Sequence, residues 1–202
     1  MVLCGVFLLC AGGIGWVLIR HIRRRRNHLL GYLGERAVGE QLGQLEHSGF
    51  RVFHDIPAEN KGKKFNIDHV VVGPTGLFAI ETKTRRKGRA RPGFKDHEVR
   101  FDGRQLVWPW GEDRHGLDQA KNEAEWLTKW IRQITGLDVL AEPVLALPGW
   151  FVNCETRPAF KILNEQNVPK HIRDWSKNQT LTPEQADLIA RQLEARCRDV
   201  ED

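Results

Sequence analysis

Two carboxylates and an ammonium group occur near one another in the sequence, in the first half of the chain, at Asp68, Glu81 and Lys83. They belong to the stretch IDHVVVGPTGLFAIETK, residues 67–83, in which two apolar runs flank the turn residues Gly73 to Gly76. Apolar runs joined in this way predict a β-hairpin. Carboxylate oxygens suit a hard divalent cation, and such a cation beside a lysine can activate water.

The register of this hairpin would bring the two acids face to face. If Val72 pairs with Leu77, Asp68 pairs with Glu81. Opposed residues have Cβ atoms about 5 Å apart, so the two negative charges repel unless Lys83 and a cation such as Mg²⁺ compensate them. Two alternatives stay open: Glu81 forms a surface ion pair with Lys83 or Arg85, or a one-residue bulge undoes the register.

A third acid, Glu35, precedes the hairpin in a predicted helix. Val38 and Leu42 form the apolar stripe of that helix, and Glu35 lies three residues before Val38, on the same stripe. A carboxylate that faces a core needs a partner, so Glu35 is a further candidate for the site. The alternative is a first-turn acid that the helix dipole stabilises.

The elements that must position these groups form one α/β domain. In chain order we expect a helix at 34–47, a strand at 50–56, a polar loop at 58–64, the hairpin at 67–83, a second hairpin at 97–101 and 104–108, a helix at 118–135, strands at 139–147 and 160–163, and a helix of about 14 residues from Pro183. Asp102-Gly103 is expected to be the two-residue turn of the second hairpin.

The N-terminal segment predicts a membrane span. Val2 to Ile19 has no charged residue, and as a helix of about 1.5 Å per residue it would cover about 27 Å of a hydrocarbon layer about 30 Å thick. Arg20 and Arg23 to Arg26 follow it, which predicts a single pass through the cell (inner) membrane by residues 1–26, with the N-terminus outside and residues 27–202 in the cytoplasm. A cleaved signal peptide is the alternative, but its basic stretch would come first.

Charge and cysteines restrict the function classes. The five arginines of residues 20–26 account for the whole formal charge of +5, so the rest of the chain is neutral and gives no general argument for nucleic acid. Cys154 and Cys197 have no metal-ligand spacing, which excludes a zinc motif of the usual kind. The chain also lacks a Walker-type phosphate loop and a nucleophilic Ser or Cys motif.

A basic tract follows the hairpin without an acid in it. Its members are Lys83, Arg85, Arg86, Lys87, Arg89 and Arg91. With Lys63 and Lys64 from the preceding loop, these residues could flank the site and contact phosphates. The alternative is a solvated loop whose charge is balanced by acids elsewhere.

These residues together resemble a known family. The resemblance rests on Gly34-Glu35 with Val38 and Leu42, on Ile67 to Pro74, on Gly76 to Lys83, and on Gln119 with Asn122. It is to the NERD (nuclease-related) domain, a member of the PD-(D/E)XK nuclease superfamily, and it covers about residues 30–135. It implies a restriction-endonuclease-like core of helix, three-strand meander, helix and strand at about 30–150. The N-terminal span precedes this core, and a C-terminal helical extension at 165–202 follows it.

The resemblance also implies roles for single residues. Asp68, Glu81 and Glu35 would hold Mg²⁺ or Mn²⁺, Lys83 would orient the attacking water, and Gln119 would be a polar contact from the second helix. The implied activity is hydrolysis of phosphodiester bonds in nucleic acid, DNA rather than RNA. Two alternatives stay open: a non-catalytic nucleic-acid-binding module with this fold, and a membrane-tethered scaffold in which the acidic pair is structural.

Overall fold

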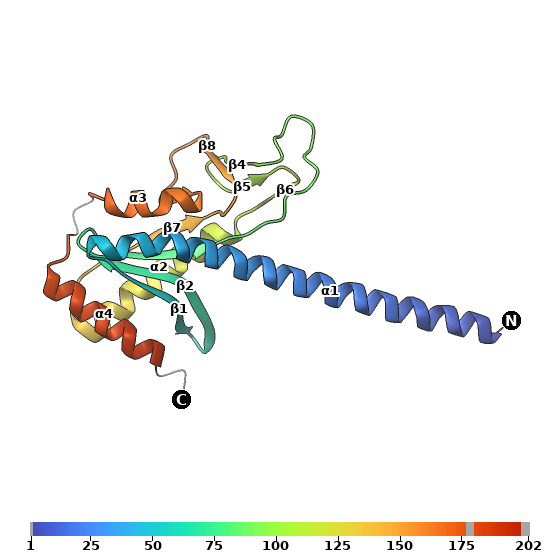
Figure 1. The fold of residues 1–202 in the computed structure, drawn as a ribbon, viewed down its shortest axis with the longest axis horizontal. Helices are drawn as coiled ribbons and strands as arrows, with labels where there is room; N and C mark the ends of the chain where they lie inside the picture. The colour runs from blue at the N-terminus through green and yellow to red at the C-terminus, as the bar shows by residue number, and fades with distance from the viewer. Residues whose placement is uncertain (1, 177–179, 199–202) are drawn as a thin grey trace.

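The computed structural model describes residues 2–176 and 180–198, with the side chains of the first helix described from residue 13 onward. The chain is a mixed α/β protein with two sheets (Figure 1). The larger sheet has the order β1 (Arg51–Asn60), β2 (Lys63–Gly73), β3 (Gly76–Thr82), β7 (Ala141–Ala146), β9 (Lys161–Leu163). The smaller sheet has the order β6 (Gly111–Asp113), β5 (Leu106–Trp108), β4 (Glu98–Phe101), β8 (Phe151–Cys154).

Helices cover both faces of the larger sheet. They are α1 (Val2–Leu42), α2 (His115–Thr135), α3 (Val168–Arg173) and α4 (Pro183–Arg198), with short 3₁₀ segments η1 (Gly43–Ser48) and η2 (Glu165–Asn167). One core cluster joins the sheet to α2 and α4, and a second joins it to α1, η1 and α3. A third cluster packs the smaller sheet against the start of α2. The larger sheet is therefore the middle of three layers.

The predicted meander and its hairpin register are confirmed. β1, β2 and β3 pair antiparallel in sequence, and Val72 lies opposite Leu77. β7 then joins β3 in parallel after the α2 crossover, as expected for a strand that follows a helix. The predicted C-terminal helix is also present, and its Thr182 and Gln185 cap each other, with backbone N–H groups donating to side-chain oxygens at 3.0 and 3.3 Å.

Two local predictions are wrong. The polar loop expected at 58–64 belongs instead to β1 and β2, which pair out to Asn60 and Lys63. Lys61 and Gly62 alone make the turn, with φ angles of 52° and 78° that suit the tight turns of hairpins. In the second hairpin Phe101 pairs with Leu106, which leaves four residues in the connection rather than two.

The cause of this second error is the side chain of Asp102. Its Oδ1 accepts hydrogen bonds from the backbone N–H groups of Arg104 and Gln105 at 2.8 and 2.9 Å. An Asp that bonds the backbone in this way favours a wider turn than the Asp-Gly dipeptide suggests. The partner of Phe101 is therefore Leu106, two residues further along the chain than the predicted Arg104.

Helix α1 is continuous from Val2 through the arginine run to Leu42, and its N-terminal part projects from the body (Figure 1). In the part of the chain whose side chains are described, no helix is long and apolar enough to cross a membrane. The predicted span at 2–19 includes residues 2–12, whose side chains lie outside this description. The structure thus gives no support to the predicted span, which stays a prediction.

The other end of α1 approaches the sheet closely at Gly34. A Cβ atom there would overlap Cγ2 of Thr84, two residues after β3. At Gly31, one turn earlier, the nearest atom to an added Cβ would be Oε1 of Glu35 at 3.8 Å, an ordinary contact. Glycine at 34 therefore lets the helix bring Glu35 close to the end of β3.

We expect Gly34→Ala to destabilise the protein. Overpacking costs about 1–3 kcal/mol, more than the roughly 0.5–1 kcal/mol that alanine gains over glycine inside a helix. Thermal unfolding followed by circular dichroism, on the full chain in mild detergent, should show a lower Tm. Thr84→Ser, which removes Cγ2, should restore it in the double variant, and Gly31→Ala should not lower it. A Gly34→Ala protein as stable as the parent would contradict this close approach.

Candidate active site

The pairing of β2 with β3 ends one step before the two predicted acids. The last paired residues are His69 and Ile80, and the backbone N–H of Thr82 donates to Oδ2 of Asp68 at 2.8 Å. The Asp68 carboxylate thus accepts a backbone donor of the neighbouring strand. This bond holds Asp68 beside the end of β3, where Glu81 lies.

The predicted alternation of faces is interrupted at Asp68. Ile67 and Val70 belong to the same core cluster, although strict alternation would place them on opposite faces. On β1, Asp55 falls opposite Asp68 in the register and has a left-handed φ of 51°. The predicted register is therefore confirmed as far as His69 and Ile80, but the pair of Asp68 with Glu81 is not formed, and a local irregularity determines where Asp68 points.

Glu81 lies in the interior of the protein, with 2 % of its surface exposed. Lys83 Nζ donates to its Oε1 at 3.4 Å, and Gln119 Nε2 donates to its Oε2 at 2.9 Å. Lys83 Nζ also donates to Oε1 of Gln119 at 3.2 Å. Asp68, Glu81, Lys83 and Gln119 are thus brought together as predicted, from the middle of β2, the end of β3 and helix α2.

A further carboxyl group, Glu123, completes what we call the acid cluster: the half-buried Asp68 with the buried Glu81 and Glu123. Glu123 is 2 % exposed, and its Oε1 accepts a hydrogen bond from Gln119 Nε2 at 3.0 Å. Its Oε2 is buried and has no donor among the described residues. Within residues 13–176 and 180–198, the cluster therefore has three acids and a single ammonium group, that of Lys83.

Burial raises the pKa of each member, and repulsion from neighbouring carboxylates adds to this effect. Burial, then repulsion from Asp68 and Glu123, raises the pKa of Glu81 to about 9, although Lys83 lowers it. Burial raises the pKa of Glu123 to about 7 and that of Asp68 to about 6, against the hydrogen bonds that each accepts. The folded site therefore favours neutralisation of these groups by protons or by a cation.

Glu35 lies near the acid cluster but apart from its hydrogen bonds. It lines a hollow of about 400 Å³ together with Asp55, Asp68, His54 and His69, which we call the α1-side hollow. Burial, then repulsion from Asp55, raises the pKa of Glu35. Within that hollow the ring nitrogens Nδ1 of His54 and His69 are 2.7 Å apart, and burial beside His54 lowers the pKa of His69 to about 3.

The predicted basic residues lie in different surroundings. Arg85 donates to Oδ2 of Asp113 at 2.9 Å and lies over the ring of Trp108, so it joins the loop to the smaller sheet. Lys87 lies over the ring of Trp150, with Nζ 5.8 Å from its centre. Arg86 and Lys64 are exposed, and Lys63 lines a hollow beside α2.

Comparison with known proteins gives the family. The model of the nuclease-related domain matches residues 30–148, from α1 to just past β7. The chain belongs to the NERD family. This assignment is consistent with the PD-(D/E)XK superfamily, and it places the acid cluster inside the matched segment.

One curated relative is an uncharacterized protein of Bacillus anthracis. It is 35 % identical over 54 residues, which cover 26 % of this NERD protein and 26 % of the relative. The match thus spans about a quarter of each chain. No solved structure matches this chain.

The carboxylates of the NERD domain suit an ion that keeps some of its waters, such as Mg²⁺, better than an ion that is held by protein ligands alone. Among the described residues, no three His, Cys, Asp or Glu side chains converge in a way that could hold a metal. Mg²⁺, however, needs only one or two protein carboxylates and keeps several waters. Asp68 and Glu81 supply two carboxylates, and the unpartnered Oε2 of Glu123 shows that the site has more acceptors than donors.

Sequence reasoning missed Glu123 and Asp55. Glu123 lies three residues after Ala120 and four before Leu127, on the apolar stripe of α2, so the argument used for Glu35 would have found it. Asp55 gave no such signal, because it lies in a strand with its side chain exposed. Its place opposite Asp68 depends on the β1–β2 register.

The raised pKa values predict that the protein, held in EDTA, loses stability as pH rises. Folded values of about 6, 7 and 9 exceed the ordinary values near 4, so this contribution to stability is complete below about pH 4 and is lost progressively up to about pH 9. Thermal melts between pH 5 and 9 should show a falling Tm. Glu123→Gln should flatten the decline, whereas Glu125→Gln, on the exposed side of α2, should leave it unchanged. An equally steep decline in Glu123→Gln would contradict the prediction.

Proposed function

We propose that this NERD protein is a membrane-anchored, divalent-metal-dependent nuclease that hydrolyses phosphodiester bonds of nucleic acid, with DNA as the favoured substrate. The observation that supports the proposal is the acid cluster beside Lys83 and Gln119. Two buried carboxyl groups, with the half-buried Asp68 beside them and one ammonium group in contact, are costly unless a cation neutralises them. The family assignment agrees with a nuclease-related role.

The residues divide the chemistry between them. Asp68 and Glu81 would hold Mg²⁺ or Mn²⁺, with Glu35 as a further ligand or an orienting acid. A bound divalent ion lowers the pKa of water and neutralises charge that develops on the phosphate. Lys83 lies within hydrogen-bonding reach of Glu81 and Gln119, so its ammonium group is held where it can orient the attacking water and stabilise the phosphate oxygens. Gln119 fixes the Glu81 side chain by donating to Oε2.

The basic loop after β3 supplies candidate phosphate contacts. Arg86 is exposed and forms no ion pair among the described residues, and the same holds for Lys63 and Lys64 of the β1–β2 hairpin. Lys87 keeps its charged end at the surface of the smaller sheet. Together with Arg85, these residues would attract the phosphate backbone, an interaction that salt weakens.

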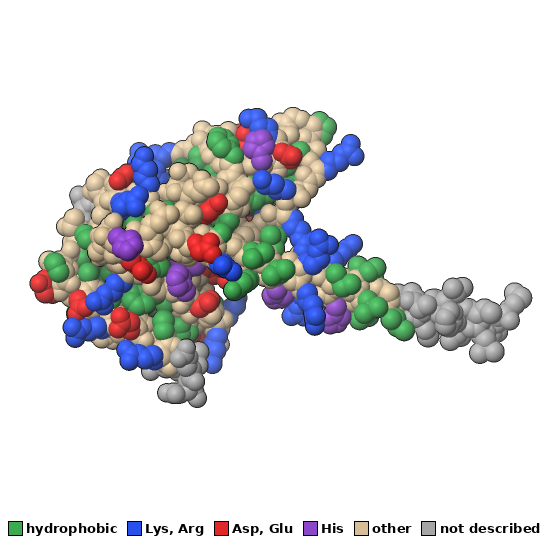
Figure 2. Space-filling model, viewed as in Figure 1, with side chains coloured by type: hydrophobic (Ala, Val, Ile, Leu, Met, Phe, Trp, Pro, Cys, Tyr) green, Lys and Arg blue, Asp and Glu red, His purple; other side chains and the backbone are tan. Residues whose placement is uncertain are grey.

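The proposed anchor rests on α1. Trp16, Val17, Leu18 and Ile19 are consecutive and each is 44–62 % exposed, so apolar side chains surround the helix instead of forming one stripe. An all-round apolar helix suits lipid, and the arginines at 23–26 suit the cytoplasmic headgroups. Figure 2 shows apolar and basic side chains along this projecting part of α1.

Metal-dependent cleavage is the first test. The full chain in mild detergent is incubated with single- and double-stranded DNA and RNA in Mg²⁺, Mn²⁺ or EDTA. We expect cleavage with metal only, and losses of about 10²–10⁴-fold in kcat/KM for Glu81→Gln and Lys83→Met, because each removes a group that acts on the reacting phosphate or on the ion.

Lys121→Met is the matched control, since Lys121 is exposed on α2 and its ion pair is with Glu125, at 3.9 Å. It should retain full activity. Cleavage that persists in EDTA, or in both site variants, would disprove this mechanism. Binding of nucleic acid without cleavage, unchanged by Glu81→Gln, would make the domain a non-catalytic binding module, and no binding at all would leave a scaffold.

The anchor has its own test. A reporter that works in the cytoplasm should be active when it is fused to the C-terminus, and a reporter that works only outside the cytoplasm should be inactive. Carbonate extraction of membranes should leave the full chain in the pellet. Replacement of Leu8 and Leu9 by Asp, near the middle of the predicted span, should release the protein, because each charge costs about 3 kcal/mol at the centre of a span. A full chain that is extracted like a peripheral protein would contradict the proposal.

A further inference from the structure

The acid cluster lies between two hollows that differ in charge. The α1-side hollow is lined by the carboxylates of Glu35, Asp55 and Asp68. Its arginine, Arg36, is already paired with Glu40 at 2.8 Å. A phosphate or a nucleotide would meet mostly negative charge on this side.

The second hollow, of about 450 Å³, lies between the end of the β1–β2 hairpin and α2, and we call it the α2-side hollow. The hairpin contributes Asn60, Lys63 and Phe65, and the helix contributes His115 and Asn122. Two amides, an aromatic ring and a cation are the groups that proteins use for the edge, the face and the phosphate of a nucleotide. The volume is in the usual range for a small-molecule site, about 300–1,000 Å³.

This hollow adjoins the acid cluster directly. Gln119 and Glu123 also line it, and Gln119 donates to Glu81. The remaining acid of the hollow, Asp118, lies 3.4 Å from Arg114. A molecule in the α2-side hollow would therefore have its neighbouring phosphate close to Glu81 and Lys83, and it would meet less negative charge than on the α1 side.

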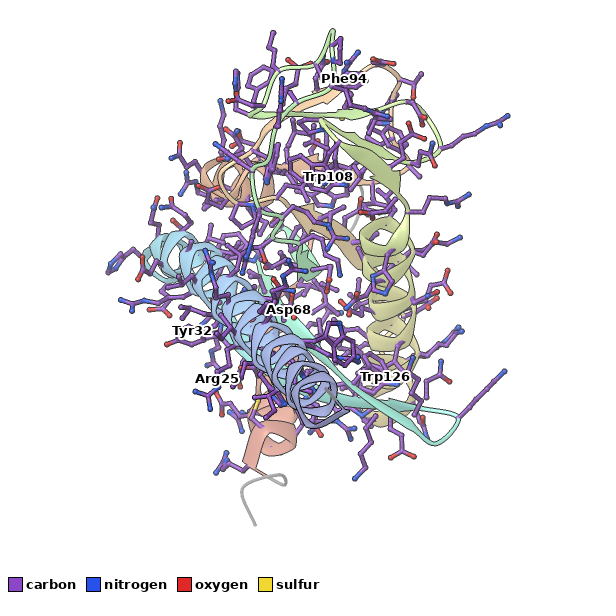
Figure 3. All side chains as sticks on the ribbon, turned by 90° about the vertical axis from the view of Figure 1, so that its right-hand side faces the viewer. Arg25, Tyr32, Asp68, Phe94, Trp108 and Trp126 are labelled. Atoms are coloured by element: carbon purple, nitrogen blue, oxygen red, sulfur yellow. The ribbon has the colours of Figure 1, made fainter. Side chains whose placement is uncertain are left out.

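Phe65, the aromatic residue of the hollow, is held in place by contacts with α2. The ring of Phe65 contacts the ring of Trp126 edge to face, with centroids 5.8 Å apart. Trp126 Nε1 donates to the backbone oxygen of Glu59 at 2.8 Å, which fastens the hairpin to α2. Trp126 in turn stacks on Trp130, and Arg196 lies over both rings at 5.4 Å. Figure 3 shows Trp126 on α2 beside this end of the hairpin, with Asp68 between α1 and α2.

We propose that the α2-side hollow binds the base of an unpaired nucleotide whose phosphate lies at the acid cluster. This inference rests on the proposed nuclease function and names its substrate class. Phe65 stacks on the base, the amides of Asn60 and Asn122 bond to its edge, and Lys63 neutralises an adjoining phosphate. A base inside a duplex is stacked and paired, so the substrate is single-stranded, frayed or flipped at the cut.

Binding without catalysis is the first part of the test. The full chain in detergent and EDTA is dialysed to equilibrium against deoxyadenosine 5′-monophosphate or 2-deoxyribose 5-phosphate. We expect the nucleotide to bind about tenfold or more tightly, the usual effect of stacking one base on an aromatic ring. Phe65→Leu and Asn122→Ala should each reduce that preference, and Lys129→Ala, exposed on the same helix, should preserve it.

The second part of the test measures cleavage, in a cycle that combines one protein variant with one altered substrate. A single-stranded oligonucleotide that lacks one base next to the cut should be cleaved about tenfold or more slowly by the parent protein, as expected when one stacked base is lost. Phe65→Leu should slow cleavage of the complete oligonucleotide by a similar factor but have little further effect on the abasic one. Such non-additivity shows that the ring and the missing base contact each other.

The two proposals can fail separately. Equal affinity for the nucleotide and the sugar phosphate, or losses that multiply in the cycle, would overturn the base site while leaving the nuclease in place. A parent protein that cleaves nothing would overturn the nuclease, and the dialysis comparison alone would then decide whether the hollow binds a base.

Discussion

Charge neutralisation at the end of β3 is the constraint to which the neighbouring structure responds. Glu81 and Glu123 are buried and Asp68 is half-buried beside them, and Lys83 is the one ammonium group that contacts Glu81 there among the described residues. Removing such groups from water is expensive unless each finds a partner. The backbone N–H of Thr82 and the amide of Gln119 satisfy part of this need. They do not satisfy all of it, because burial still raises the pKa of Glu81.

The elements around the cluster are placed where they supply these partners. The parallel pairing of β3 with β7 continues through Thr82 and Ala146, and the backbone N–H of Lys83 donates to the Ala146 oxygen at 2.9 Å, which fixes the main chain from which Glu81 and Lys83 project. Helix α2 crosses the same face and brings Gln119 and Glu123 on successive turns. The smaller sheet packs beside the start of α2, and Arg85 binds Asp113 within it.

Much of this arrangement could be predicted from the residues alone, because it depends on local patterns. The turn at Pro74 and Thr75 sets a register that brings Asp68 and Glu81 to the end of the β2–β3 pairing, and apolar spacing places Glu35 on the side of α1 that faces the site. What could not be predicted depends on distant contacts or on side-chain competition with the backbone. Asp55 reaches the site through the register of another strand pair, and Asp102 widens a turn that its dipeptide alone would make tight.

The unbroken course of α1 has a mechanical consequence. Glu35 lies on the same rigid rod as Trp16 and the arginine run, with no proline or 3₁₀ segment between them. Rotation of the exposed half about its long axis would therefore be transmitted as torque to Glu35, while Asp68 stays fixed in the sheet. The exposed half of α1 and the carboxylate of Glu35 thus belong to one continuous helix, and the close approach at Gly34 limits how far that helix can turn against the sheet.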